Sequence, residues 1–303
     1  MLGEIFYWLF NMSIAAAICG VPILLLRRIR RLSRRVAVLF WLIPFIRLCI
    51  PVGITGKYGL MTLLSRVTTR TVTVYQPAED ISFTFMNHVM AANSYFPITY
   101  KVDLLADVFA VASVLWAIVA LALLLAFAII YRATLRELKG AVPRADGTYR
   151  SDRVRVPAVY GVLRPRIVLP ADWEGDTLYV RMHEEAHLKR GDHVTRLIAG
   201  ALVCLHWFNP LAWLFLKHLY ADVELACDEA VLARIAPEKR KEYAHTLLNA
   251  AESATVLAPS FGGASIRLRL QSILSYRKIS AVALVSSAIL LLTIAYVLLT
   301  NAA

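Results

Sequence analysis

The residues whose types and spacing could do chemistry lie in one short segment, HEEAHLKRGDH, at positions 183–193. His183 and His187 are four positions apart, so on a helix both imidazoles lie on one side and can reach a single zinc ion. Glu184 lies beside them, where its carboxylate can take a proton from an attacking water molecule. The segment therefore predicts two ligands and the general base of a zinc-dependent hydrolase.

The third ligand is open at this point, because a catalytic zinc ion usually has three protein ligands and one free position. His193 follows His183 at the spacing of the metzincin pattern, which needs a glycine at position 190 to turn the chain. This chain has Arg190 there, and its glycine comes one residue later, at Gly191. The near miss argues against His193 as a ligand without excluding it.

A carboxylate from a later segment is the alternative. In the segment ELACDEAVL, Glu224 and Asp228 are four positions apart, which places both on one face of a helix. One carboxylate can then bind the metal while the other holds a ligand histidine through its second ring nitrogen. HExxH followed by ExxxD is the gluzincin pattern, and it makes a carboxylate of this helix the favoured third ligand.

A hydrolase of this kind also needs a hydrogen-bond donor for the transition state. Tyr220, His218 and His206 are the candidates, although each is more simply explained as a packing residue or a residue at the membrane surface. Glu185 and Asp192 are interpreted as solvated charges on a helix face.

The elements that position these residues belong to a membrane protein. Of the 303 residues, 59% are hydrophobic, and the mean hydropathy of +0.60 is too high for an ordinary soluble domain. Four apolar runs have roughly the 20 residues that a helix needs to cross the hydrocarbon core. We expect a mainly α-helical membrane protein with four transmembrane helices and a cytoplasmic α+β zinc metalloprotease domain of the gluzincin type. The four runs cover residues 5–26, 36–54, 108–131 and 279–299.

The distribution of charge predicts the orientation in the cell membrane. The segment RRIRRLSRR, residues 27–35, places six arginines directly after the first apolar run, as expected for a cytoplasmic loop. The net charge of +12 is therefore interpreted as a topology and lipid-binding signal, and we expect no direct binding of nucleic acid. Both termini are then outside, and the long segment 132–278 is cytoplasmic.

This topology divides the chain into four parts. Within the cytoplasmic part, residues 141–169 have strand character and the sequence becomes helical after Pro170. The parts are residues 1–131, with three transmembrane helices, the basic inner loop 27–35 and an outer loop 56–103; residues 132–278, the metallopeptidase domain; residues 279–299, the fourth transmembrane helix; and residues 300–303, a short outer tail.

A fifth apolar run, residues 197–216, is long enough to span the membrane. A full crossing would place Glu224 on the opposite side from His187, so the two could not share a metal ion. We therefore expect the run to bend back or to lie buried, with HWFNP, residues 206–210, as the break and with protein or water around the non-helical backbone. The metal site is then expected close to the inner membrane surface.

These motifs resemble the BlaR/MecR-type membrane metallopeptidases, the antirepressor family of β-lactam-resistance signalling. The similarity is carried by VPAVYGVLRPRIVLP, HEEAHLKRGDH, HWFNPLAW and ELACDEAVL in matching order and spacing, together with the four apolar runs. The resemblance implies one Zn²⁺ ion bound by His183, His187 and Glu224, with Glu184 as general base; Asp228 is then left to support a ligand histidine. It also implies a role in transmembrane signalling by cutting a cytoplasmic protein, such as a winged-helix repressor, often after self-cleavage.

The match has one departure. Sensors of that family carry an extracellular penicillin-binding domain after the fourth span, whereas this sequence ends at Ala303. The sequence therefore gives no support for β-lactam sensing: either the signal is different or the chain is truncated. Arg277 and Lys278, which link the domain to the last span, are the expected self-cleavage point. The other expected partners are membrane lipids and a second copy of the chain in a homodimer.

Two other functions remain open from the sequence. A membrane zinc protease of the quality-control or prenyl-protein-processing type would share HExxH and a later glutamate, and substrate profiling would separate it. A non-catalytic receptor could hold the same zinc ion as a structural site. The intact Glu184 argues against that receptor, and a proteolysis assay would decide.

Overall fold

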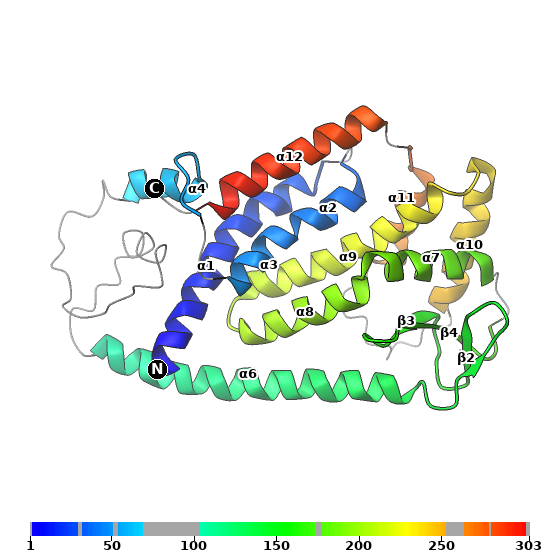
Figure 1. The fold of residues 1–303 in the computed structure, drawn as a ribbon, viewed down its shortest axis with the longest axis horizontal. Helices are drawn as coiled ribbons and strands as arrows, with labels where there is room; N and C mark the ends of the chain where they lie inside the picture. Colours follow the sequence, from blue (N-terminus) through cyan, green and yellow to red (C-terminus); the bar gives the residue numbers. More distant parts are fainter. Residues whose placement is uncertain are drawn as a thin grey trace.

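A helical bundle carries a small mixed domain at one end (Figure 1). The computed structural model describes residues 2–29, 32–50, 54–68, 104–173, 177–252, 264–278 and 280–300. The predicted outer loop, residues 56–103, lies largely outside these ranges; within it the structure describes α4 (Leu60–Thr68). The mainly helical character expected from the sequence is confirmed.

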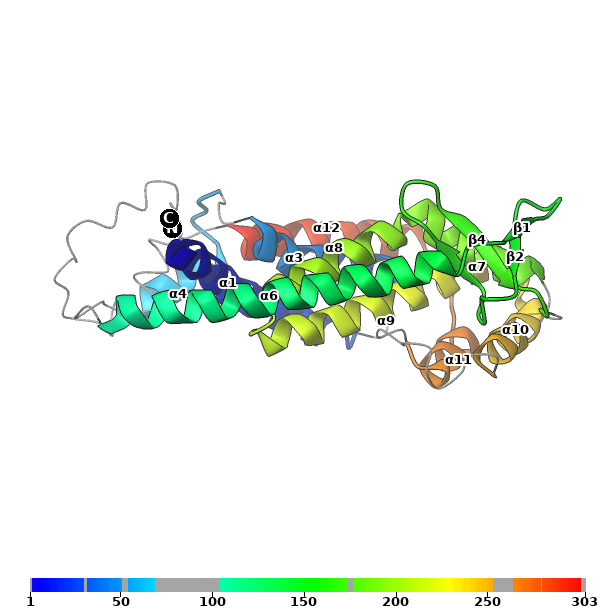
Figure 2. The same ribbon diagram turned by 90° about the horizontal axis from the view of Figure 1, so that it is seen from below.

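Three helices of the described chain are long and apolar enough to cross a membrane. They are α1 (Leu2–Leu26), α6 (Leu104–Arg136) and α12 (Ala281–Leu299). In both views α6 runs along the whole bundle to the small domain (Figures 1 and 2). The start of α1 and the end of α12 lie at the same end of the bundle (Figures 1 and 2).

The predicted second span, residues 36–54, is not one straight helix. It forms α2 (Arg34–Phe40) and α3 (Leu42–Cys49), which meet at Trp41. Pro44 has no N–H group to bond to the carbonyl four residues earlier, so the helical hydrogen-bond ladder is interrupted there. Neither helix alone has the length of a span. The described chain therefore shows three candidate spans where the sequence predicted four.

The fifth apolar run bends back, and this prediction is confirmed. It is divided into α8 (Asp192–Leu205) and α9 (Pro210–Leu232), which lie side by side (Figure 1). Asn209 caps α9 by accepting from the N–H of Leu211 at 3.0 Å, and its amide donates to the carbonyl of Ser13 at 3.1 Å. The turn thus has the protein partners that non-helical backbone needs in an apolar environment.

The segment predicted to have strand character forms a four-stranded sheet. Its order is β1-β2-β4-β3, with β2 and β4 parallel and the other two pairs antiparallel. Gly161, with φ of +91°, makes the turn between the last two strands. The strands are β1 (Val142–Pro143), β2 (Tyr149–Ser151), β3 (Ala158–Tyr160) and β4 (Arg166–Pro170).

The long helix α9 joins the bundle to the small domain. Its first part belongs to the core of the bundle, where Phe215 packs so closely on Gly20 of α1 that a side chain at position 20 would collide with the phenyl ring. Its last turn, with Val231 and Leu232, belongs to a separate core. That second core is built with α7 (Thr177–Arg190), α10 (Arg240–Glu252), which follows the 3₁₀ turn η1 (Pro237–Lys239), and α11 (Ile266–Leu274).

Candidate metal centre

The predicted HExxH residues lie on the inner face of α7. His183, Glu184 and His187 are all buried, while Glu185 lies on the outer side and pairs with Arg181 at 2.7 Å. This arrangement follows from the helical repeat, since positions 183 and 187 are about one turn apart. Glu185 is thus a helix-face charge, as interpreted from the sequence.

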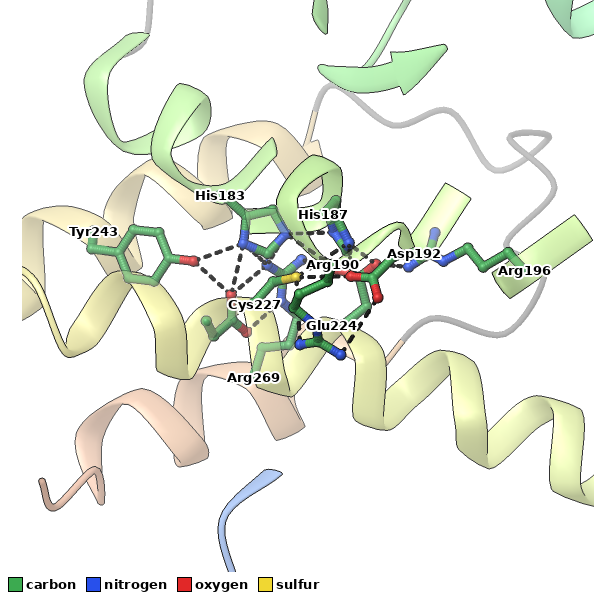
Figure 3. Close-up of polar contacts among 10 residues, drawn as sticks. His183, His187, Arg190, Asp192, Arg196, Glu224, Cys227, Tyr243 and Arg269 are labelled. Carbon is green, nitrogen blue, oxygen red and sulfur yellow. Dashed lines mark hydrogen bonds and ion pairs between the residues drawn. The ribbon is translucent and has the colours of Figure 1, made fainter. Parts of the chain in front are cut away.

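The two histidines meet a carboxylate of α9 (Figure 3). The Nε2 atoms of His183 and His187 are 3.2 Å apart, and they lie 3.4 Å and 3.6 Å from the two carboxylate oxygens of Glu224. A tetrahedral zinc ion with bonds of about 2.0–2.2 Å separates its ligand atoms by roughly 3.3–3.6 Å. Two imidazoles and one carboxylate at this spacing fit a zinc ion, and these three residues form a candidate metal-binding group.

Glu224 is held in its ionised form. Burial alone would raise its pKa, but the charges of Arg196, His187 and Arg269 hold the pKa of Glu224 well below its usual range. Arg196 donates directly to one carboxylate oxygen, and Nη1 of Arg269 lies 3.3 Å from the other. An ionised carboxylate is the form that binds a metal ion.

Asp228 supports His183, in the place expected from the ExxxD spacing. Its Oδ1 lies 3.2 Å from Nδ1 of His183 and accepts a hydrogen bond from the hydroxyl of Tyr243 at 2.6 Å. Arg269 donates to both carboxylate oxygens of Asp228, at 2.8 Å and 2.7 Å. Burial and Arg269 lower the pKa of His183, but hydrogen bonds to Asp228 and Glu224 outweigh them and raise it to about 9. A metal ion bound here therefore displaces a proton.

Asp192 supports His187, which corrects its interpretation as a solvated charge. Its carboxylate is buried and lies 2.9 Å from Nδ1 of His187. The physical reason is Gly191, whose left-handed backbone (φ +68°) ends α7 and turns the chain sharply into α8. The glycine that lies one position later than in the metzincin pattern thus brings Asp192 to His187. His193 is not among the three candidate ligands.

Cys227 completes a second candidate metal-binding group with His187 and Asp192. Its sulfur lies 3.2 Å from Nδ1 of His187 and 3.3 Å from Asp192. Burial, followed by the charge of Asp192, raises the pKa of the Cys227 thiol, and the protonated thiol donates to Asp192. Arg190, 3.5 Å from Asp192, adds positive charge beside this group. We therefore assign these residues to holding His187.

A cavity of about 290 Å³ opens beside the three candidate ligands, and Glu184 lines it. One wall is the segment around β3, an edge strand that pairs with β4 alone among the strands that the structure describes. His193 also lines the cavity, and its buried Nδ1 has no hydrogen-bond partner within the described residues. The sequence reasoning missed Arg196, Tyr243 and Arg269, which belong to no motif; Tyr243 and Arg269 also lie far along the chain from HExxH. Asp192 had a signal, the helix-ending glycine before it.

The three predicted transition-state donors lie elsewhere, because none of them lines the cavity. The hydroxyl of Tyr220 donates to the carbonyl of Arg196 at 2.8 Å, and His218 stacks on Trp41. His206 lies in the turn between α8 and α9, where both ring nitrogens have protein partners. Their positions do not fit the predicted role.

The predicted self-cleavage residues, Arg277 and Lys278, are exposed and lie in the irregular link between α11 and α12. Residues 276–278 belong to neither a helix nor a strand. Their position is compatible with access by a protease.

Comparison with known proteins decides the family. Residues 7–273 match the family described as BlaR1 peptidase M56. The chain belongs to this M56 family. The match confirms the resemblance inferred from the motifs and, with the three candidate spans, makes the chain a membrane protein of a metallopeptidase family.

Curated relatives of the M56 chain cover only part of it. Regulatory protein BlaR1 of Bacillus licheniformis is 34% identical over 103 residues, which is 33% of this chain and 17% of that protein. The methicillin resistance mecR1 proteins of Staphylococcus aureus and Staphylococcus epidermidis are each 25% identical over 103 residues, 32% of this chain and 18% of those proteins. The similarity thus spans less than a fifth of each relative's length.

Proposed function

We propose that this chain is a zinc metalloendopeptidase embedded in the cell membrane, which acts in transmembrane signalling by cutting a cytoplasmic protein. The observation that supports it best is the triangle of His183, His187 and Glu224 beside buried Glu184. Structural zinc sites are closed by four protein ligands, whereas catalytic sites keep one position open. Three ligands facing a cavity of about 290 Å³ favour catalysis over a receptor with structural zinc.

The reaction that these residues support is hydrolysis of a peptide bond. Zinc supplies Lewis acidity, which polarises the scissile carbonyl and makes water a better nucleophile. Glu184 takes a proton from the attacking water and passes it to the leaving amine as the C–N bond breaks. Asp228 and Asp192 fix the rings of His183 and His187 through their Nδ1 atoms, which leaves both Nε2 atoms facing the carboxylate of Glu224, where the three residues would hold a metal ion.

His193 is the proposed donor to the developing oxyanion. It lines the cavity with the ligands, and its Nδ1 has no partner in the described part of the chain. The free edge of β3 offers backbone groups to an extended substrate, which would bind as an added strand. An extended, unfolded segment of a protein is therefore the proposed substrate.

The proposed partner is a cytoplasmic protein such as a winged-helix repressor, in line with the names of the curated relatives, a regulatory protein and resistance proteins. We place both termini outside and residues 132–278 inside, on the basis of the arginine-rich segment 27–35. The exposed link at Arg277 and Lys278 is the proposed site of self-cleavage.

Two variants of the purified protein test the proposal: one removes the general base and the other removes a metal ligand. Glu184→Gln is expected to retain one zinc ion but to lose activity on an unfolded protein by about 10²–10⁴-fold, because only the proton transfer is removed. Glu224→Ala is expected to lose both zinc and activity, and Glu238→Gln, an exposed residue of η1, serves as control. Wild-type protein that binds no zinc, or Glu184→Gln with full activity, would contradict the proposal.

Self-cleavage is tested on the same samples. Mass spectrometry of wild-type protein is expected to show a cut beside Arg277 or Lys278 that is absent from Glu184→Gln. Identical fragments from the two proteins would show that another protease makes the cut.

A further inference from the structure

A second cluster of charged groups lies on α9, away from the metal centre. Asp222 is fully buried, and its Oδ2 accepts hydrogen bonds from Nε of Arg27 at 2.7 Å and from the indole of Trp41 at 2.9 Å. Arg34 lies 3.6 Å from the other carboxylate oxygen. Two arginines of the predicted lipid-binding segment 27–35 thus form ion pairs with a helix of the protein itself.

Glu229 makes the second half of this cluster. Its carboxylate accepts hydrogen bonds from the hydroxyl of Ser33 at 2.7 Å and from the backbone N–H of Arg34 at 2.8 Å. Arg35 donates to the backbone carbonyl of Glu229 at 3.0 Å. We call the contacts of Asp222 and Glu229 with Arg27, Ser33, Arg34, Arg35 and Trp41 the α9 clamp.

Helix geometry places the clamp and the metal ligand on different sides of α9. Asp222 and Glu224 are two residues apart, which is about 200° around the helix axis. Asp222 and Glu229 are seven residues apart, about two turns, and so share a face. The helix that carries Glu224 and Asp228 is therefore held on one side by α7 and α11 and on the other by the link between α1 and α2.

Two buried carboxylates are costly unless they are paired, and a buried ion pair adds little stability over a well-packed apolar contact. What hydrogen bonds to a charged group fix is orientation, because they are short and directional and several of them converge on each carboxylate here. A rotation of α9 about its axis would break the clamp and, on the opposite face, would withdraw Glu224 from the two histidines.

We propose that the α9 clamp sets the rotation of α9 and so controls zinc affinity, which makes Asp222 a positioning residue for Glu224. Arg27 directly follows α1, a candidate membrane span, so the clamp couples the membrane part of the chain to the metal centre. This inference rests on the proposed function, because it presupposes that Glu224 binds zinc.

The test measures zinc Kd on the full chain in detergent, by competition with a chelator. Asp222→Asn and Arg27→Gln are each expected to raise the zinc Kd about tenfold. The double variant is expected to change the Kd by less than the two single effects combined, because both single variants remove the contact between Arg27 and Asp222. The visible spectrum of the Co²⁺-loaded protein is expected to change in the clamp variants, since it reports the geometry of the ligands.

Two controls separate positioning from general loss of stability. Glu238→Gln removes an exposed charge, and Trp116→Phe removes the hydrogen bond to the carbonyl of Leu205 at 2.8 Å in the bundle. Both are expected to keep the wild-type zinc Kd and Co²⁺ spectrum, although Trp116→Phe lowers the thermal midpoint. If Asp222→Asn does not fold, Arg27→Gln and Arg35→Gln decide by the same measurement.

Unchanged zinc Kd in the folded clamp variants, or an equal rise in Trp116→Phe, would overturn the inference while the proposed function stands. Wild-type protein that binds no zinc would overturn the proposed function itself, and the inference with it. The two failures are therefore distinguishable from one set of samples.

Discussion

A group of polar contacts around a buried histidine lies at each end of α8: one around His206 and one around His187. The two clusters differ in what the ring nitrogens of these histidines contact. At its end, Nδ1 of His206 pairs with the hydroxyl of Ser13 at 2.7 Å and Nε2 with the carbonyl of Leu48 at 3.0 Å. At its start, Nδ1 of His187 pairs with Asp192, but Nε2 faces His183 and the carboxylate of Glu224. The first cluster is closed and the second opens into a cavity.

The difference teaches that burial of a histidine is no guide to function. A closed cluster satisfies every polar group and so stabilises a turn in an apolar environment. The open cluster directs two imidazoles and a carboxylate to one point beside a cavity, where they would offer three ligands to a metal ion. The four predictions that follow test this contrast.

The largest effect is expected from His193, the cavity residue with a free nitrogen. His193→Ala is expected to lower kcat/KM by about 10²–10³-fold with zinc content unchanged, because one donor to the oxyanion is removed. Steady-state proteolysis and metal analysis check both parts. Loss of zinc would instead restore His193 as a ligand, and His218→Ala, outside the cavity, is the matched control.

The closed cluster is expected to affect stability alone. His206→Ala should lower the free energy of unfolding by about 2–4 kcal/mol, because Ser13 and the carbonyl of Leu48 lose their partner inside the bundle. Zinc Kd should stay at the wild-type value. Unfolding in a denaturing detergent, followed by helical content, measures the first part, and a changed zinc Kd would show that the two clusters are coupled.

Asp192, which supports His187 in the open cluster, is expected to affect the affinity for zinc. Asp192→Asn should raise the zinc Kd about 10–100-fold, since the carboxylate no longer fixes the ring of His187. Glu185→Gln is the control, as Glu185 forms only exposed ion pairs on the outer side of α7. Equal zinc affinity in both variants would show that the contact between Asp192 and His187 does not support metal binding.

The smallest effect is expected from Cys227. Cys227→Ala should change the zinc Kd by less than about threefold, because a protonated thiol is only a weak hydrogen-bond partner of His187. Chelator competition is sensitive enough to detect a larger change. A large loss of affinity would show that the metal sits between His187, Asp192 and Cys227 instead of beside Glu224.

Much of the site follows from local rules of sequence. The four-residue spacings of His183 with His187 and of Glu224 with Asp228 place each pair on one helix face, because the helical repeat is a property of the backbone. The apolar run 197–216 had to bend back at the HWFNP segment if His187 and Glu224 were to meet, and the structure has that turn. Composition and the basic segment 27–35 were sufficient to predict a membrane protein.

Local rules could not supply contacts between distant segments. Asp192 reaches His187 because Gly191 turns the chain, whereas Arg269 and Tyr243 reach Asp228 only through the packing of α11 and α10 on α9. Likewise, the arginines of residues 27–35 carry the same charge whether they face lipid or protein. Only the packing of α1 and α2 against α9 brings Arg27 to Asp222, because hydrogen-bond partners at this separation are selected by tertiary structure and not by spacing.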